Sequence, residues 1–548
     1  MRDMDKAIAR IDRAIADNER ILVYGDYDVD GTSAVALLYS YLKTQTSNID
    51  FYIPDRENEG YGISFKGIDY AKTTGVKLIV ALDCGIKAVE QVDYATERGI
   101  DFIIGDHHLP GDELPRAVAV LDAKRSDCKY PFKELSGCGV SFKIVEAHVE
   151  HMVGVRCCDR GADLSPSQRE VRDQLLEFLL HFLDLVAVSI ASDIVPIVGE
   201  NRVLAFYGLK VINSHPRPGL EAILKYGHVS KRNGSPSGDL SYFNKELTIS
   251  DLVFLVGPRI NAAGRIHSAF DSVRLMLSTE KEQAEELARE INNYNQERKK
   301  FDSAATEEAK ELIEGDPLLK NRKSIVLFNA SWHKGVVGIV ASRLVETYNK
   351  PTVVFSLSSD NMIVGSARSF KEYDIHTALE QCADLLEHFG GHRCAAGVSL
   401  RPENLEAFID RFEEVVASSI ATVEVIPEIE VDAEVSFADH LTPKFFRILK
   451  QFAPFGPENS MPVFVTRNLV DTGAPAPRVV GGKHLKFNVI PLEMRSRSFP
   501  AIALHRGQEV SLMSKGCHFD LCYQIEENHW NGRTDIQLNV KDIHYHEG

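Results

Sequence analysis

Residues 21–43 read "ILVYGDYDVDGTSAVALLYSYLK", and this stretch decides the fold expected of the first part of the chain. The aliphatic and aromatic run before Asp26 predicts a short buried strand, and the segment after Gly31 predicts a helix. Asp26, Asp28 and Asp30 would then lie at the carboxyl end of a strand, where open α/β sheets bind their ligands. Three carboxylates in one turn repel one another unless a cation or hydrogen-bond donors neutralise them. The stretch therefore predicts a cation site.

Two other interpretations of this turn were weighed against the sequence. A calcium-binding EF-hand loop requires a bidentate glutamate at its twelfth position, which here is Leu37. An EF-hand also needs a helix before the loop, where this sequence predicts a strand. A solvent-exposed acidic turn accounts for one or two of the aspartates, but less well for three followed by a glycine.

The same strand-then-helix unit recurs from residue 21 to about residue 122. The expected strands are "ILVYG", "IDFYI", "KLIVALD", "DFIIGD" and "AVAVLD". Strands that alternate with amphipathic helices indicate a doubly wound parallel sheet, so we expect an α/β fold.

Three further regions follow this sheet. The polar segment 280–314 is almost free of glycine and proline, which predicts a spacer helix. A second α/β unit continues to about residue 400, and short alternating strands after residue 425 predict a β-barrel of the OB-fold type. We therefore expect four parts: a doubly wound domain at 1–270, a long connecting helix at 271–316, a smaller α/β domain at 317–424 and an OB-fold nucleic-acid-binding domain at 425–548.

Composition narrows the class of protein. The 548 residues carry 62 basic and 79 acidic side chains, for a formal net charge of −17. This charge argues against a protein that coats nucleic acid, but it allows a local basic groove.

The longest apolar run, 175–191, is interrupted by Glu177, His181 and Asp184, so we expect a buried helix there and no membrane span. The N-terminal segment lacks the apolar region of a signal peptide, and the nine cysteines form no C-x-x-C pair, so we expect a cytoplasmic protein without a zinc site or disulfide framework.

Two later strands of the predicted sheet also end in polar side chains. Asp83 follows "LIVAL", and Asp106, His107 and His108 follow "FIIG". Because parallel strands end at the same edge of a sheet, these residues should converge on the first three aspartates, with Asp193 as a further contributor after an apolar helix.

The chemistry expected of this set is metal-assisted phosphoester hydrolysis. Carboxylate and imidazole ligands suit a pair of Mn²⁺ or Mg²⁺ ions, and histidine favours Mn²⁺. Two ions about 3.5 to 4 Å apart can both generate hydroxide and stabilise the leaving oxygen of a phosphoryl displacement.

The ordered motifs resemble those of a known superfamily. "GDYDVDG", "ALDCG", "GDHH" and "ASDIVP" are similar to the four motifs of the DHH phosphoesterases, and "GSARS" and "GGHRCAAG" to the DHHA1 domain. The segment "GPRINAAGRI", the spacer helix and the terminal barrel narrow the resemblance to the RecJ family. That resemblance implies a single-strand-specific 5′-to-3′ DNA exonuclease that acts in DNA repair and recombination.

The resemblance also implies roles for single residues. It makes two metal ions the cofactors, with the ligands Asp26, Asp28, Asp30, Asp83, His107 and Asp193. His108 would protonate or stabilise the leaving group, and Asp106 would orient it. The 5′-terminal phosphate and nearby backbone would be held by Arg56, Arg265, Ser366, Arg368 and His392. Tyr24 stands where the wider superfamily often has a histidine ligand, so Asp26 is expected to replace it.

Rival functions remain at this point. Within the superfamily, the chain could be an oligoribonuclease, a cyclic-dinucleotide phosphodiesterase or a polyphosphatase, but these relatives generally lack a barrel that stacks bases. From another class, it could be a non-catalytic single-strand-binding scaffold with a decayed site. The expected partners are single-stranded DNA, a helicase and a single-strand-binding protein, with no membrane, and we expect a monomer.

Overall fold

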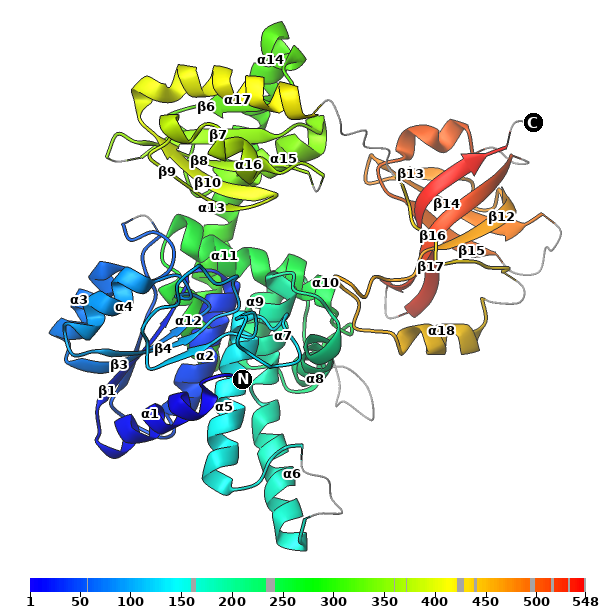
Figure 1. Cartoon of the computed structure of the whole chain (residues 1–548). Helices are drawn as coiled ribbons and strands as arrows, with labels where there is room; N and C mark the ends of the chain where they lie inside the picture. Colours follow the sequence, from blue (N-terminus) through cyan, green and yellow to red (C-terminus); the bar gives the residue numbers. More distant parts are fainter. Residues whose placement is uncertain are drawn as a thin grey trace.

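The computed structural model describes residues 1–548 except 57, 159–163, 233–241, 359, 371, 421–427, 438–440, 493–497, 514–516, 531–532 and 547–548. Two α/β units are stacked on each other and joined by a long helix, and a barrel lies beside them (Figure 1). The predicted boundary between residues 424 and 425 lies outside the described residues.

The first unit is built on a five-stranded parallel sheet in the order β2-β1-β3-β4-β5. The strands are β1 (Arg20–Gly25), β2 (Ile49–Tyr52), β3 (Val76–Leu82), β4 (Asp101–Gly105) and β5 (Ala119–Leu121). They match the five strands predicted from sequence. The α/β prediction for this unit is therefore confirmed.

Alternate side chains of these strands face two apolar layers. Val23, Val80 and Ile103 pack with α1 (Met4–Ala16), α2 (Val29–Leu42), α5 (Gly137–Val153) and α7 (Leu183–Ser192). Tyr24 and Ile79 face the opposite side, against α3 (Phe65–Thr73) and α4 (Val89–Thr96). Burial on both faces explains why the strands are continuous apolar runs.

The remaining helices extend the first layer. They are α6 (Pro166–Leu180), α8 (Gly199–Ser214), α9 (Pro218–Lys225), α10 (Ile249–Asp251), α11 (Gly257–Ile266) and α12 (Phe270–Leu277), with a π-helical turn at Leu252–Val256. The run 175–191, predicted as one buried helix, instead breaks into α6 and α7, which meet at 45°. Only α7 is buried throughout, because the outer part of α6 projects from the unit (Figure 1). Among the described residues no single helix could cross a membrane, although this bent pair has the length and composition to do so.

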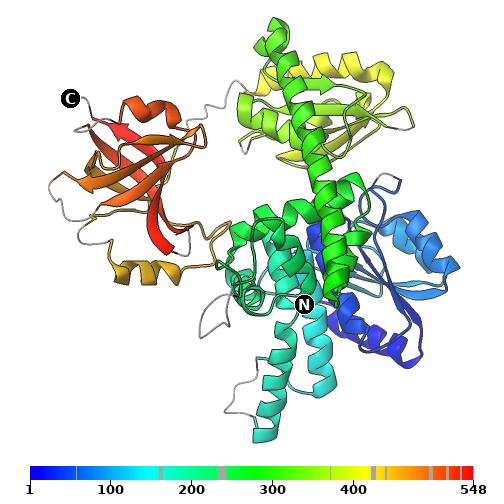
Figure 2. The same cartoon turned by 180° about the vertical axis from the view of Figure 1, so that it is seen from behind.

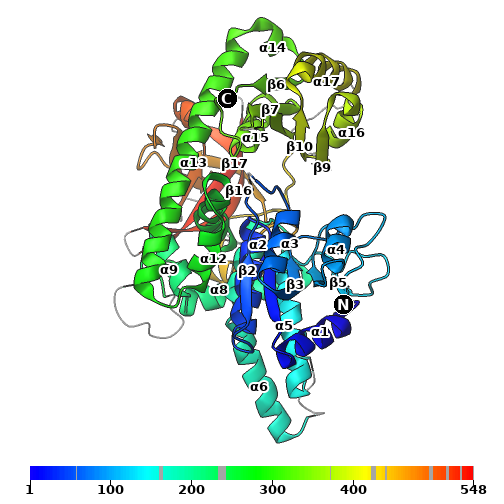
Figure 3. The same cartoon turned by 90° about the vertical axis from the view of Figure 1, so that its left-hand side faces the viewer.

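Helix α13 (Lys281–Gly315) runs along both units, as Figures 2 and 3 show. At a rise of 1.5 Å per residue, its 35 residues span about 52 Å. The helix matches the polar segment 280–314 predicted as a spacer helix, but the part predicted to connect the units from residue 271 also includes a separate helix. That helix is α12, Phe270–Leu277, which packs against α2, α9 and α11 of the first unit.

The second unit has a mixed sheet in the order β6-β7-β8-β10-β9. Its strands are β6 (Ile325–Phe328), β7 (Thr352–Leu357), β8 (Ile363–Arg368), β9 (His388–His392) and β10 (Ala395–Leu400). Its helices are α14 (Pro317–Asn321), α15 (Val337–Tyr348), α16 (Ile375–Glu380) and α17 (Leu405–Ile420). The β9–β10 hairpin lies on the side that faces the first unit (Figure 3).

The C-terminal region is a closed barrel. Its strands are β11 (Ala433–Glu434), β12 (Phe464–Asp471), β13 (Arg478–Val480), β14 (His484–Pro491), β15 (Phe499–Ala503), β16 (His518–Trp530) and β17 (Arg533–Tyr545), with helix α18 (Pro443–Lys450) before β12. The order β12-β16-β17-β15-β14 closes because β14 also pairs with β12. This confirms the barrel predicted from sequence.

Candidate functional site

The turn after β1 places three aspartates at the amino end of α2. Asp28 caps the helix, and its Oδ1 accepts a hydrogen bond from the Gly31 amide at 3.0 Å. Asp26 is buried and accepts a bond from the Gly62 amide at 3.4 Å. Gly31 leaves no room for a side chain, because a Cβ there would lie 2.5 Å from the Asp26 carbonyl oxygen. The glycine thus lets the helix begin directly against the end of the strand.

Asp30 is held in place by two other helices. Its carboxylate accepts hydrogen bonds from the amides of Gly137 and Cys138, each at 2.7 Å, and from the Ser189 hydroxyl at 2.6 Å. The two amides open α5 and have no partner within that helix, so a carboxylate satisfies them and interacts favourably with the helix dipole. Asp30 therefore joins β1 and α2 to α5 and α7, and fixes the shape of the site.

Asp83 and His107 carry buried polar atoms that have no hydrogen-bond partner. These atoms are Asp83 Oδ1 and both ring nitrogens of His107, within the described part of the chain. The Nε2 atom of His107 lies 3.2 Å from Asp83 Oδ1, 3.7 Å from Asp30 Oδ2 and 3.6 Å from Asp193 Oδ2. Native proteins rarely leave such atoms unsatisfied, so this cluster is prepared for a ligand that the protein itself does not supply.

The carboxylates of the cluster repel one another. Burial, and then the charge of Asp28, raises the pKa of Asp26 well above its ordinary value. Burial and then Asp30 raise the pKa of Asp83 and bring the pKa of Asp193, at the end of α7, to about 8. A divalent cation between these groups would reverse the shifts, because its charge favours the ionised carboxylates.

His108 and Asp106 form a pair at the edge of this cluster. The Nδ1–H of His108 donates to Asp106 Oδ1 at 2.8 Å, and its Nε2 shares a hydrogen bond of 3.2 Å with the Tyr61 hydroxyl. Asp106 also accepts the amides of Ile86 and His107. Burial alone would raise the pKa of Asp106, but the hydrogen bond and charge of His108 outweigh it and lower the pKa to about 2. Burial alone would lower the pKa of His108, and Asp106 overcomes this and raises it.

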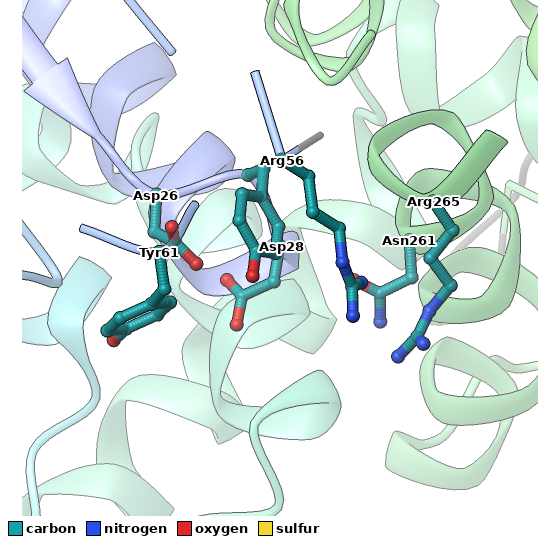
Figure 4. A pocket seen from close by; sticks show the side chains of 7 residues that line it. Asp26, Asp28, Arg56, Tyr61, Asn261 and Arg265 are labelled. Carbon is teal, nitrogen blue, oxygen red and sulfur yellow. The ribbon is translucent and has the colours of Figure 1, made fainter. Parts of the chain in front are cut away.

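A cleft of about 210 Å³ lies beside the acidic turn (Figure 4). It is lined by Asp26, Tyr27, Asp28, Arg56, Tyr61, Asn261 and Arg265. Figure 4 shows the two aspartates on one side of the cleft and the guanidinium groups of Arg56 and Arg265 on the other. Asn261 lies between the two guanidinium groups. Arg265 also donates from Nη1 to the Gly335 carbonyl oxygen at 3.2 Å, which ties the first unit to the second.

The arginines of this cleft are gathered without acidic partners. Burial, and then the charges of Arg56, Arg298 and Arg368, lowers the pKa of Arg265 to about 10. Arg368, on β8, donates to the Ser366 hydroxyl at 2.6 Å, and burial and then Arg56 lower its pKa. Within the part of the chain that the structure describes, Arg56, Arg265 and Arg368 form no ion pair.

The predicted site residues therefore fall into two neighbouring groups. The acidic group contains Asp26, Asp28, Asp30, Asp83, His107 and Asp193, with Asp106 and His108 at its edge. The basic group contains Arg56, Arg265, Ser366 and Arg368. His392 lies on β9, where burial, and then the charges of Lys87 and His108, lower its pKa.

Several residues of the site escaped the sequence analysis. Tyr61 and Asn261 line the cleft, and Ser189 and the α5 amides hold Asp30. The two glycines that flank Tyr61, both with positive φ, are a local signal that the loop is specially shaped. Tyr24, at the position where a histidine ligand is common, is buried and donates to the Gly62 carbonyl oxygen at 3.0 Å, so its role is structural.

Three family models match the chain in order. The DHH family N-terminal domain matches residues 20–190, the DHHA1 domain matches residues 321–418, and the RecJ OB domain matches residues 431–542. The match to the RecJ OB domain favours the exonuclease interpretation over the relatives that lack a barrel.

Curated and solved relatives agree with these models. The single-stranded-DNA-specific exonuclease RecJ of Bacillus subtilis is 35% identical over 99% of this chain, which spans 63% of that protein. RecJ of Escherichia coli K12 is 32% identical over 98% of this chain and 90% of its own length. The crystal structure of Thermus thermophilus RecJ in complex with Mn²⁺ superposes with a TM-score of 0.77 and 26% identity, and covers 100% of this chain and 72% of that one.

Proposed function

Because the chain belongs to the RecJ family of single-stranded-DNA-specific exonucleases, we propose that it removes nucleotides from the 5′ end of a DNA single strand toward the 3′ end, with two divalent ions, Mn²⁺ or Mg²⁺, as cofactors. The Thermus thermophilus relative was solved with Mn²⁺, which supports the use of a divalent ion.

The observation that carries this proposal is the set of buried atoms without partners at the carboxyl edge of the sheet. Asp83 Oδ1 and both nitrogens of His107 face carboxylates whose pKa values burial and mutual repulsion raise. Oxygen and imidazole donors of this kind fit Mn²⁺ or Mg²⁺. The residues that would hold the ions are Asp26, Asp28, Asp30, Asp83, His107 and Asp193. Bound ions of this class supply charge that polarises a phosphoryl oxygen and lowers the pKa of an attacking water.

The pair Asp106–His108 supplies a proton at the other side of the scissile bond. Asp106 fixes the ring by accepting Nδ1–H, so that Nε2 points toward Tyr61 and the cleft. Asp106 raises the pKa of His108, which favours a proton on its ring for transfer to the leaving oxygen. Asp106 itself stays ionised, since its pKa is about 2.

The basic group binds the 5′ end. Arg56, Arg265 and Arg368 form no ion pair among the described residues, and the Ser366 hydroxyl on β8 accepts a hydrogen bond from Arg368 at 2.6 Å. A terminal phosphate carries more charge than an internal one and can accept several bidentate arginine contacts. This pocket would therefore place the first internucleotide phosphate at the acidic group.

Further properties follow from the family. We propose that the protein acts in DNA repair and recombination in the cytoplasm, as a monomer that works with a helicase and a single-strand-binding protein. The barrel would bind the more distant part of the strand. The buried aromatic side chains of its strands, Phe464, Phe487, Phe499, Phe519 and Tyr523, belong to the core, so phosphate contacts would supply much of that affinity.

Labelled single strands test the polarity of digestion. A strand with a 5′ label should release labelled mononucleotide at once in Mn²⁺, while the same strand with a 3′ label should shorten stepwise. Blunt duplex and RNA of the same sequence, and single strands in EDTA, should persist. Stepwise shortening of the 5′-labelled strand would show the opposite polarity and contradict the proposal.

A further inference from the structure

The carboxyl edge of the first sheet changes charge from one side to the other. In the order β2-β1-β3-β4-β5, the loop after β2 carries Arg56 and the turn after β1 carries the aspartates. The loop after β3 carries Lys87, the loop after β4 carries the two histidines, and the turn after β5 carries Lys124. Since neighbouring strands lie about 4.8 Å apart, the edge measures about 19 Å from the arginine side to the lysine side.

Asp122 positions Lys124 at this edge. Asp122 directly follows β5, is fully buried, and its Oδ1 accepts a hydrogen bond from the Lys124 amide at 2.6 Å. The Lys124 ammonium is 3.7 Å from a carboxylate oxygen of Glu134, which is 44% exposed, so it is free to take a stronger partner.

Lys87 lies on the same side of the site. It is exposed and follows β3. Its side chain packs near Gly111, because a Cβ added to that glycine would lie 3.7 Å from the Lys87 Cγ. In the described part of the chain it forms no ion pair. Lys87 and Lys124 therefore flank the two histidines with ammonium groups that no carboxylate neutralises firmly.

The sheet of the second unit repeats this order of charges. Ala395 on β10 pairs with Arg368 on β8 at one side and with His392 on β9 at the other, so the three form one row of about 10 Å. Burial and then Arg56 lower the pKa of Arg368, whereas burial and then Lys87, His108 and Lys124 act on His392. Arg368 is thus within electrostatic reach of Arg56, and His392 within reach of the two lysines, while the β9–β10 hairpin lies on the side of the second unit that faces the first (Figure 3).

We propose that the DNA strand crosses this edge in one direction, and that Lys87, Lys124 and His392 bind the phosphates on the 3′ side of the scissile bond. The 5′-terminal phosphate lies at the arginine side and the scissile phosphate lies at the acidic group. This placement rests on the proposed function, because it takes the arginine cleft as the 5′-phosphate site. It assigns to the two lysines a contact that a substrate with only one internucleotide phosphate cannot make.

Two substrates of different length test the placement. A 5′-phosphorylated dinucleotide has only the scissile internucleotide phosphate, whereas a 5′-phosphorylated pentanucleotide also has phosphates on its 3′ side. In Lys87→Ala and Lys124→Ala, KM for the pentanucleotide should rise about tenfold or more, as expected for loss of a charged contact, with little change in kcat. KM for the dinucleotide should change less than twofold. The slope of log affinity against log salt for longer strands should fall by about 0.7 for each lysine lost.

Matched variants separate this role from a structural one. Lys124→Arg keeps the charge and should keep the pentanucleotide KM within a few-fold. Lys77→Ala removes an exposed lysine from the opposite end of β3 and should have no effect on either substrate. Equal losses on both substrates would place the lysines at the scissile phosphate, and no loss on either would place the strand elsewhere; both results overturn the placement. If wild-type protein releases no mononucleotide from the 5′ end of the pentanucleotide, the proposed function itself fails.

Discussion

The acidic group after β1 and the arginine cleft beside it have opposite charge but share one physical property. In the acidic group, burial and repulsion raise the pKa of Asp83 and bring that of Asp193 to about 8. In the cleft, burial and repulsion lower the pKa of Arg265 to about 10. In each group, the fold holds like charges close enough to repel one another when no ligand is bound.

The two groups nevertheless do not neutralise each other. Asp26 and Asp28 line the same cleft as Arg56 and Arg265, yet the arginines form no ion pair among the described residues. Asp106 shows the contrast, because His108 neutralises it and lowers its pKa to about 2. We infer from this difference that the unpaired charges bind ligands. The acidic group binds cations, and the arginine cleft binds a phosphate.

Removal of one charge from the acidic group should have the largest effect. Asp193→Asn keeps the shape of the side chain but loses a charged ligand, so turnover should fall by about 10³-fold or more, since such electrostatic contributions reach about 4 kcal/mol. Binding of single-stranded DNA should persist, measured by fluorescence anisotropy with Ca²⁺ in place of Mn²⁺. Asp17→Asn, an exposed aspartate at the end of α1, is the control. Turnover within tenfold of wild type would remove Asp193 from the metal centre.

The matching change in the arginine cleft should affect recognition rather than chemistry. Arg368→Ala loses a charge-assisted contact worth about 1.5 to 3 kcal/mol, so the preference for a 5′-phosphorylated over a 5′-hydroxyl strand should fall by about ten- to a hundredfold. Arg368→Lys should retain part of the preference, because it keeps the charge but not the planar fork. The ratio of kcat/KM for the two strands is the measurement. An unchanged ratio in Arg368→Ala would mean that the second unit does not bind the 5′ end.

The acidic group also makes the stability of the metal-free protein depend on pH. The pKa of Asp193 is about 8 in the folded chain and its ordinary value is 3.8, so the folded state binds the proton more tightly than the unfolded state does. The contribution to stability is therefore complete below about pH 4 and is lost as the pH rises to about 8. In EDTA, Tm should fall between pH 5.5 and 8.5, and Mn²⁺ should restore it at the upper pH.

One variant tests whether Asp193 causes this fall of Tm with pH. Asp193→Asn should flatten the fall of Tm with pH in EDTA, because asparagine does not titrate. If the metal-free wild-type protein instead gains stability over this range, the carboxylates are not repelling one another as the structure indicates.

The smallest effect is expected at the barrel, where basic side chains lie on an open surface and not in a cleft. Arg478 on β13 pairs in register with Lys486 on β14, and neither forms an ion pair within the described chain. The double change Arg478→Glu and Lys486→Glu should weaken binding of strands longer than about 20 nucleotides by a few-fold and reduce the salt slope by about 1.4. A trinucleotide should bind as before, and Lys444→Glu on α18 serves as the control. Equal weakening of the trinucleotide would show that the barrel acts on the catalytic cleft.

The strands of the first sheet and the edge at which its charges meet could be predicted from sequence. Buried parallel strands are short apolar runs, and the side chains that follow them must share one edge. The same reasoning placed Asp83 and His107 beside Asp30, which the distances confirm.

The features that sequence reasoning missed depend on tertiary packing. The α5 amides reach Asp30 from more than a hundred residues away, and no local pattern reveals such a contact. The polar composition of 280–314 located the spacer helix, but the packing of the separate helix α12 on α2 and α9 was needed to assign 270–277 to the first unit. Phe464, Phe487, Phe499, Phe519 and Tyr523 of the barrel strands lie in its core, and a strand pattern cannot distinguish such core aromatics from a stacking surface.

A titration with Mn²⁺, followed by the electron paramagnetic resonance signal of the free ion, tests most directly whether the two groups bind different ligands. We predict saturable binding by wild-type protein at pH 8 and by Arg368→Ala, and loss of that binding in Asp83→Asn. Asparagine tolerates the positive φ of position 83, so the variant should fold. Binding that survives unchanged in Asp83→Asn, or is lost in Arg368→Ala, would contradict the assignment of cations to the acidic group and phosphate to the arginines.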